Sequence, residues 1–356
     1  MKADYLIIGQ GICGTLLSWN LLKRGKKVFV IDDAFPFSAS KVASGIINPV
    51  TGRRIVTTWM AEELLPFVWK EYSDFGEELK ATIIEQKNTI VFPPSFQMKE
   101  TYEKRMTESD SFIQSVQNPN IYDHAFNFIF DCYTIEPTYI INLHTMMHNW
   151  KKELISKKAF MNENFDEAHL QVNENSITYK NIEATKVIFC SGSECFKSIY
   201  WKNLPYVYNK GQAMLADIPD LSTNNIYKFG AITLAPWYDG LWWIGSSYEN
   251  EFDTIDPTDT FKIGTEKALQ SILRLPFTII DHFAAIRPAT IERRPFVGLH
   301  PYYNTIGIFN GMGTKGCSLA PYFAKQFADY LTTDKPIDAL ADVKRFGRIL
   351  GKTETL

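Results

Sequence analysis

The segment from Tyr5 to Asp33 constrains the fold more than any other part of the chain. Residues 5–8 are an apolar run typical of a buried strand in a parallel sheet. A turn with three glycines follows, and leucines at helical spacing then predict a helix over residues 13–24, which ends before Gly25. A second apolar run, residues 27–33, contains Asp32. This order of strand, glycine-rich turn, helix, strand and acid predicts a βαβ unit of a doubly wound α/β fold.

The turn has the spacing Gly-x-Gly-x-x-Gly, which is typical of dinucleotide sites. The first glycine allows the tight turn, the second lets the backbone approach a pyrophosphate, and the third lets the helix pack close to the strand. The helix N-terminus then offers N–H groups and a positive dipole end to the phosphates. The residues that we expect to hold the dinucleotide here are Gly9, Gly11, Ile12, Cys13, Gly14, Asp32 and Asp33.

The acid after the second strand selects the kind of dinucleotide. Asp32 lies where a carboxylate accepts hydrogen bonds from a ribose hydroxyl, and it disfavours the 2′-phosphate of NADP. Asp33 is the alternative acid, but its side chain should point the other way along a strand.

Two later segments are predicted to meet the same ligand. Residues 38–54 follow the second strand, and in this polar loop Ser40 and Ser44 can bond phosphate or ribose while Gly45 gives backbone access. Residues 184–194 predict another parallel strand, which ends in Ser191 and Gly192. A hairpin is expected just before it, over residues 169–181.

A third segment, residues 284–331, carries a second glycine-rich turn. An Arg-Pro pair is followed by an expected strand over 305–310, then by glycines at 311, 313 and 316, then by a helix with Pro321 near its first turn. The sequence therefore predicts a second helix N-terminus aimed at the ligand.

These motifs together resemble the FAD-dependent oxidoreductases of the D-amino-acid oxidase and glycine oxidase type. The resemblance covers most of the chain and is carried by the first glycine motif, Asp32, the loop 40–45, "CSG" at 190–192, "KGQ" at 210–212, "WWIGSSYE" at 242–249, "IRPATIERRPFVG" at 286–298 and "GMGTKGCSLAP" at 311–321. It implies a Rossmann-like FAD domain over residues 1–74, 133–205 and 282–356. It also implies an inserted α+β substrate domain on a mixed or antiparallel sheet, over residues 75–132 and 206–281.

The resemblance also implies an activity and a set of site residues. The activity is oxidation of an amine or amino acid (a D-amino acid, glycine or an N-methyl amino acid) by hydride transfer to flavin N5. Arg287 would bind the substrate carboxylate, and its alternative role is a surface ion pair with Glu292. One of Trp242 and Trp243 would face the flavin. The expected catalytic residues are Arg287, Thr314, Tyr248 and Trp242, and the expected cofactor residues of this part are Ser191, Gly192, Gly311, Met312, Gly313, Thr314, Lys315 and Gly316.

The chain departs from the family pattern at two points. Some members have a tyrosine that helps to hold the carboxylate, and Thr233 stands at that position here. Members with covalent flavin carry a cysteine near the Arg-Pro segment, whereas this chain has none between Cys195 and Cys317. We therefore expect non-covalent FAD. The sequence does not indicate whether oxygen or another molecule accepts the electrons.

The net charge and the cysteine content limit the kinds of molecule that the chain is expected to bind. The net charge of −3 comes without a basic block, so we expect a small-molecule substrate and no nucleic acid. Five scattered cysteines without a Cys-x-x-Cys pair predict neither a metal site nor a disulfide framework, and favour the cytoplasm. No membrane span is expected, and the oligomeric state is open. The alternatives are an FAD module that acts on a modified tRNA base, a NAD-dependent dehydrogenase, and a protein that keeps FAD without catalysis.

Overall fold

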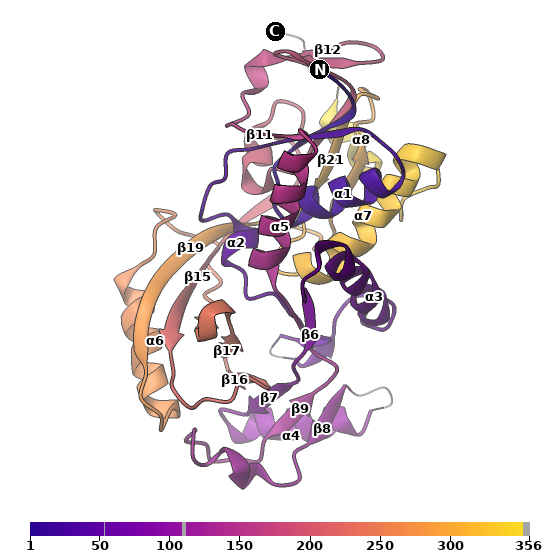
Figure 1. Cartoon of the computed structure of the whole chain (residues 1–356). Coiled ribbons are helices and arrows are strands. Elements are labelled where there is room, and N and C mark those ends of the chain that lie inside the picture. Colours follow the sequence, from indigo (N-terminus) through magenta and orange to yellow (C-terminus); the bar gives the residue numbers. More distant parts are fainter. Residues whose placement is uncertain (53, 109–111, 352–356) are drawn as a thin grey trace.

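Two large β-sheets and the helices that cover them make up the chain, and Figure 1 shows the sheets side by side. The computed structural model describes residues 1–52, 54–108 and 112–351. The helices are α1 (Ile12–Lys23), α2 (Ala39–Val42), α3 (Ala61–Leu79), α4 (Phe96–Met106), α5 (Leu143–Ser156), α6 (Asp259–Ile272), α7 (Gly316–Thr333) and α8 (Gly347–Leu350). Across these described ranges, no helix is long and apolar enough to cross a membrane.

The first sheet confirms the predicted α/β arrangement. Its strands are β1 (Lys2–Ile8), β2 (Val28–Asp32), β11 (Phe160–Asn162), β12 (Leu170–Val172), β13 (Ile177–Tyr179), β14 (Ile182–Phe189), β20 (Phe296–Leu299) and β21 (Ile306–Asn310). β1 lies between β2 and β14 and is parallel to both, and β21 is parallel to β14. The expected hairpin is the antiparallel pair β12–β13. The carboxyl ends of β1, β14 and β21 therefore lie together at one edge of the sheet.

Both faces of the first sheet are buried, which explains its unbroken apolar runs. Alternate residues of β1 point to opposite sides: Ile7 packs among residues of α1, α3, α5 and α7, while Leu6 packs against the segment 195–204 and the C-terminal residues. Burying an aliphatic side chain of this kind contributes about 2 kcal/mol. The buried sheet thus holds the glycine-rich turns at its edge in fixed positions.

The second sheet is mostly antiparallel and contains the two longest strands of the described chain. Its order is β19 (Thr278–Thr290), β15 (Tyr206–Asp217), β18 (Trp242–Gly245), β17 (Ile232–Pro236), β16 (Ile226–Phe229), β7 (Thr89–Phe92), β9 (Tyr133–Ile135) and β8 (Ile113–Ser115). β16 and β7 are its one parallel pair among these strands. Smaller pairings join β3 (Ile46–Ile47), β10 (Tyr139–Ile141) and β6 (Ile84–Gln86), and also β4 (Val50–Thr51) and β5 (Val56–Thr57).

The two faces of the second sheet have different neighbours. We call the face covered by α6 the outer face; there Trp242 and Tyr227 pack with Leu269 of α6 (Figure 1). The opposite face, which we call the inner face, presents Ala213, Trp243 and Phe283 and packs against Val42 and Ile46 from the loop after β2. The inner face therefore looks toward the edge of the first sheet that carries the turns.

The strand assignments bear on the expected domain boundaries. β9 begins at Tyr133 and β19 runs to Thr290, so both extend past the expected limits of residues 132 and 281. We propose a division that keeps the two sheets as the cores of two domains and assigns β9 and β19 to the second sheet. Arg287, on β19, then belongs to the second domain.

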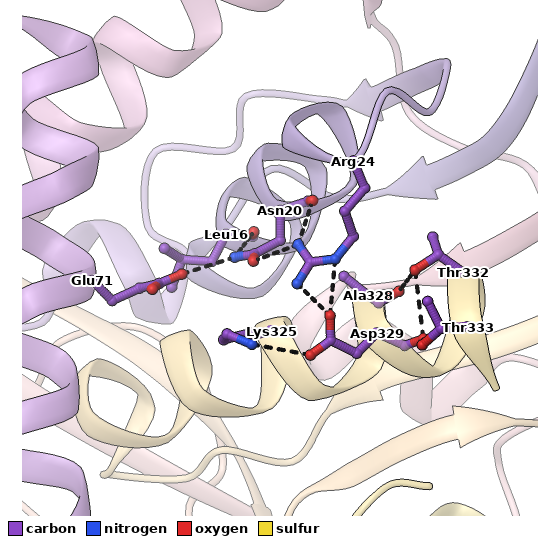
Figure 2. A network of polar contacts seen from close by, with 9 residues as sticks. All are labelled: Leu16, Asn20, Arg24, Glu71, Lys325, Ala328, Asp329, Thr332 and Thr333. Atoms are coloured by element: carbon purple, nitrogen blue, oxygen red, sulfur yellow. Dashed lines mark hydrogen bonds and ion pairs between the residues drawn. The ribbon is translucent and has the colours of Figure 1, made fainter. Parts of the chain in front are cut away.

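A network of polar side chains ties α1 to α7 at the ends remote from their turns, as Figure 2 shows. The Arg24 guanidinium donates to one carboxylate oxygen of Asp329, at 3.0 Å from Nε and 2.5 Å from Nη2. Asn20 links Arg24 to Glu71 of α3. Burial opposes the ionisation of Asp329, but hydrogen bonds from Arg24 and Lys325 outweigh it and lower the pKa of this carboxyl.

Replacing Arg24 with methionine is expected to destabilise the protein by about 2 kcal/mol at neutral pH, since Asp329 would remain half-buried without its main partner. Asp329 has a lowered pKa in the folded state, so its contribution is present above the unfolded pKa and disappears as pH falls through the folded pKa. Thermal unfolding of both proteins should therefore differ at pH 7 and converge below about pH 4. Lys70→Met, which breaks an exposed ion pair with Asp74, is the control and should leave the melting temperature unchanged. An equal melting temperature for Arg24→Met would contradict the prediction.

Candidate active site

The first glycine-rich turn has the geometry that a dinucleotide turn requires. Gly9 has a φ of +96°, and a Cβ there would lie 2.7 Å from the carbonyl oxygen of Cys190. A Cβ on Gly14 would collide with the Gly9 carbonyl oxygen. Gly11 differs, because its φ is ordinary and a Cβ would meet only the Ser40 hydroxyl, at 3.0 Å. Gly9 and Gly14 are thus needed by the fold itself, whereas Gly11 keeps the space before α1 open.

The polar groups expected around this turn lie next to it. The Ser40 Oγ accepts a hydrogen bond from the Ile12 N–H at 3.0 Å, and no side chain of α1's own N-cap residue does so. Asp32 faces the turn and accepts from the Gln10 N–H at 2.8 Å. Asp33 lies just beyond the end of β2, is exposed, and accepts a hydrogen bond from the Phe35 N–H.

The loop after α2 reaches the same region. Gly45 has a φ of +78°, and a Cβ there would collide with the carbonyl oxygen of Ile141 on β10. Ser44 precedes it and is half-buried. The carbonyl of Val42, the last residue of α2, accepts a hydrogen bond from the Trp243 indole N–H at 3.0 Å, which joins α2 to the inner face of the second sheet.

Asn310 connects the two remaining turns, and nothing in the sequence pattern singled it out. Its Nδ2 donates to the Gly192 carbonyl at 2.8 Å, and its Oδ1 accepts from the Gly311 N–H at 2.7 Å. Asn310 is buried, so both bonds are shielded from water. The turn after β14, with Ser191 and Gly192, and the turn after β21 are therefore held together at one sheet edge.

The C-terminal turn also contacts the Arg-Pro strand. The Gly313 N–H donates to the Pro288 carbonyl of β19 at 3.0 Å, which places the turn beside Arg287. Met312 is buried beneath the turn, Thr314 is exposed, and Lys315 is the N-cap residue of α7 without a side-chain cap. Burial lowers the pKa of Lys315 to about 8.

The Arg287 guanidinium lies on the inner face, over Gly211 of β15, where a Cβ would collide with it. Nη1 donates to Asn209 Oδ1 at 2.5 Å, and both terminal nitrogens lie 3.1 Å from the carbonyl oxygen of Ser247. Glu292 pairs with Arg345 at 3.2 Å. The surface ion pair considered for Arg287 and Glu292 is therefore wrong.

The groups that accept hydrogen bonds from Arg287 are all neutral, and the Glu249 carboxylate acts on its charge without a hydrogen bond. Nη2 also donates to the Ser246 hydroxyl at 3.0 Å. Burial lowers the pKa of Arg287, while the Tyr248 and Glu249 side chains act in the opposite direction. The ring of Tyr248 lies 5.9 Å from the guanidinium carbon, and this side chain is 60% exposed. A partly buried guanidinium held by neutral acceptors is suited to an anionic ligand.

The two neighbouring tryptophans are separated by strand alternation. Trp242 points to the outer face, where its ring lies 5.8 Å from that of Tyr227, so the structure does not bring it to Arg287 and the turns. Trp243 points to the inner face and leans over Gly245. The sequence predicted that only one would face inward and named Trp242 as catalytic, but the strand alternation of β18 sends Trp243 inward instead.

The geometry fits a dinucleotide with a flat ring system. Gly11 and the Ser40 hydroxyl lie at the N-terminus of α1, and Asp32 lies at the end of the neighbouring strand. The turn before α7 bonds to β19 beside Arg287. A dinucleotide turn beside a second sheet that carries a partly buried arginine is typical of dinucleotide-dependent oxidoreductases with a separate substrate domain.

Comparisons with known proteins show which class of oxidoreductase this chain is similar to. Residues 4–123 match the family described as FAD dependent oxidoreductase, DAO. This match spans the N-terminal third of the chain, and it favours an FAD-dependent oxidoreductase over a nicotinamide dehydrogenase.

Solved structures with the same fold cover nearly the whole chain. Glycine oxidase from Geobacillus kaustophilus is 14% identical, with a TM-score of 0.78 over 96% of this chain and 98% of that one. Iminodiacetate oxidase from Chelativorans sp. BNC1 is 17% identical, with a TM-score of 0.75 over 94% and 97%. L-proline dehydrogenase from P. horikoshii is 16% identical, with a TM-score of 0.75 over 98% of both chains. At these identities the likeness establishes the fold.

Proposed function

We propose that the chain binds FAD without a covalent bond and oxidises an amine that carries a carboxylate, of the D-amino acid, glycine or N-methyl amino acid type. The observation that carries this proposal is the position of Arg287 on the inner face. The next residue, Pro288, accepts a hydrogen bond from the Gly313 N–H of the C-terminal turn. A guanidinium binds the two oxygens of a carboxylate in one plane. The named solved neighbours are oxidases or dehydrogenases of small amines and amino acids, which supports the same substrate class.

The residues that would hold the cofactor follow from the site. Gly11, Ser40 and the N-terminus of α1 would bind the pyrophosphate, and Asp32 would bind a ribose hydroxyl. The N-terminus of α7, with Lys315, would stabilise negative charge on the ring system. When bound, FAD supplies the acceptor for a hydride, at its N5 atom.

Cysteine chemistry supports non-covalent binding. Cys317 is the cysteine of the second glycine turn, and its burial raises the pKa of the thiol to about 12. Cys190, beside the first turn, is also buried, and its pKa is raised well above its usual value. Thiols that stay protonated are poor nucleophiles. All five cysteines are free and buried, and we propose on this basis a reducing compartment, the cytoplasm, which cell fractionation would test.

The side chains of the second domain would orient the substrate rather than take its proton. Arg287 would fix the carboxylate, and Trp243 and Phe283 would exclude water from the inner face. A substrate amine that binds in its neutral form needs no side-chain base, so positioning accounts for the contribution of the protein. We place Tyr248 and Thr314, which are exposed, at the rim of the site.

The direct test is a visible absorption spectrum of the purified protein, followed by anaerobic titration with amino acids and N-methyl amino acids. A yellow protein that loses its colour with one of them would support both cofactor and substrate class. Acid precipitation should release the flavin into the supernatant. A yellow protein that none of these compounds bleaches would contradict the proposed substrate class.

Replacing Lys315 with methionine is expected to raise the thermal stability of the flavin-free protein near pH 7. The folded state holds Lys315 at a pKa of about 8, below that of the unfolded chain, so the unfolded state binds more protons between these values and stability rises with pH there. The gain in the variant should therefore shrink from pH 8 to pH 10. Lys202→Met, at an exposed position, is the control and should show no such trend. A gain that is independent of pH would contradict the prediction.

A further inference from the structure

A second cation lies on the inner face, and the family resemblance did not point to it. Lys228 of β16 is partly buried, and its Nζ lies 3.5 Å from the Thr233 hydroxyl. Within the part of the chain that the structure describes, Lys228 forms no ion pair. Burial lowers the pKa of this amine, which means that its charge lacks a partner that would stabilise it.

Strand pairing places Lys228 on the same face as Arg287. Lys228 pairs with Thr233, Thr233 pairs with Gly245, and Gly245 pairs with Ala213. Directly paired residues share a face of a sheet, so these four side-chain positions all belong to the inner face. Ile226, two residues before Lys228, packs with Ala213 and Trp243 in the same cluster, which agrees with this assignment.

Small residues and the Trp243 indole line the path between the two cations. The Arg287 guanidinium lies over Gly211, and the line from there to Thr233 passes Ser246 and Gly245. The Ser246 hydroxyl already accepts from Arg287, and Gly245 has no side chain. The indole edge of Trp243 and the Cβ of Ala213 lie over Gly245, so these two side chains form the floor of this strip between the two cations.

The spacing of the strands gives the distance between the two cations. Gly211 and Thr233 stand two strands apart and are offset by two residues along the strands, so the guanidinium and the amine lie about 12 Å apart. Two salt bridges of ordinary length leave about 5 Å between the bound carboxylate carbons. That separation corresponds to two carboxymethyl groups on one nitrogen, or to a short amino dicarboxylic acid.

We propose that Lys228 binds a second carboxylate of the substrate, so that the site takes an amine with two acidic groups, one on Arg287 and one on Lys228. The small Thr233 leaves the Lys228 amine reachable from the strip, which explains why a tyrosine is absent there. This inference rests on the proposed function, because it assumes that Arg287 binds the first carboxylate. Lys228 is a specificity-determining residue and takes no part in bond breaking.

The first test measures binding without chemistry. Thiodiacetate and methylthioacetate share a thioether in place of the amine and differ by one carboxylate, and calorimetric titration of the flavin-loaded protein gives their affinities. We expect thiodiacetate to bind at least about tenfold more tightly, the preference that one partly buried ion pair supplies. Lys228→Met should abolish this preference and leave methylthioacetate unchanged. The matched control is Lys186→Met, since Lys186 is also a lysine with a pKa lowered by burial, but it lies on β14.

The second test measures flavin reduction by iminodiacetate and by N-methylglycine, the corresponding amine pair. A loss of preference in Lys228→Met but not in Lys186→Met supports the inference. Equal binding of the two thioethers by the wild-type protein, or an unchanged preference in Lys228→Met, would overturn it while leaving the proposed function intact. Failure of every carboxylate to bind would instead count against Arg287 and the proposed function.

Discussion

Replacing Gly11 with valine is expected to give a folded protein that retains no FAD. The φ of Gly11 is −71°, which valine adopts without strain, and the nearest atom to an added Cβ is the Ser40 hydroxyl. The isopropyl group would fill the space at the N-terminus of α1 that a pyrophosphate needs. We expect the flavin absorbance to fall at least about tenfold per protein while the circular dichroism spectrum keeps its shape.

The control for Gly11→Val is Gly264→Val. Gly264 lies in α6, where an added Cβ meets nothing within 4 Å, and α6 covers the outer face of the second sheet. This variant should keep its flavin. Gly14→Val would be a poor test, because its Cβ collides with the Gly9 carbonyl and the protein would lose its fold as well as its ligand. A yellow Gly11→Val protein with normal flavin content would show that the cofactor does not approach the first turn.

The fold was predictable because its signals are local. The strand, glycine turn, helix and acid of the first unit follow one another within a short stretch. Their spacing predicts the parallel pairing of β1 with β2, and it predicts a helix from residue 13 where α1 begins at Ile12. The second turn and α7 carry the same local signals. Strand ends were harder, since β19 runs on from Thr278 through Arg287 to Thr290, and nothing in its composition marks the change of domain.

The sequence predicted only those site residues whose type alone suggests their role in binding. Arg287 stands out by its Arg-Pro context, and the glycines stand out by their spacing. Which of Trp242 and Trp243 points to the inner face depends on the register in which β18 pairs with β15, and the sequence does not give this register. Asn310 and Lys228 acquire their positions only through contacts between segments far apart in the sequence, so no short motif identifies them.

Replacing Arg287 with lysine is expected to raise the KM for carboxylate substrates about 100-fold or more without releasing the flavin. Lysine keeps the positive charge but loses the planar fork that binds two oxygens at once. Loss of a buried, charge-assisted pair of hydrogen bonds costs about 2–5 kcal/mol, which corresponds to roughly 30-fold to several thousandfold in affinity. Arg345→Lys is the matched control, because Arg345 is also partly buried but pairs with Glu292 beside the first sheet. It should leave KM unchanged.

A purely structural Arg287 would behave differently, and chemical rescue separates the two roles. The guanidinium holds Asn209, Ser246 and Ser247, so its loss also loosens the strip between β15 and β18. Arg287→Ala leaves a void over Gly211 of the shape of a guanidinium ion. Guanidine hydrochloride at millimolar concentration, far below denaturing levels, should restore part of the affinity for methylthioacetate in Arg287→Ala and should leave that affinity unchanged in Lys228→Met. If Arg287 only braced the strands, the melting temperature would fall, affinity for all ligands would decline together, and added guanidinium would restore none of it.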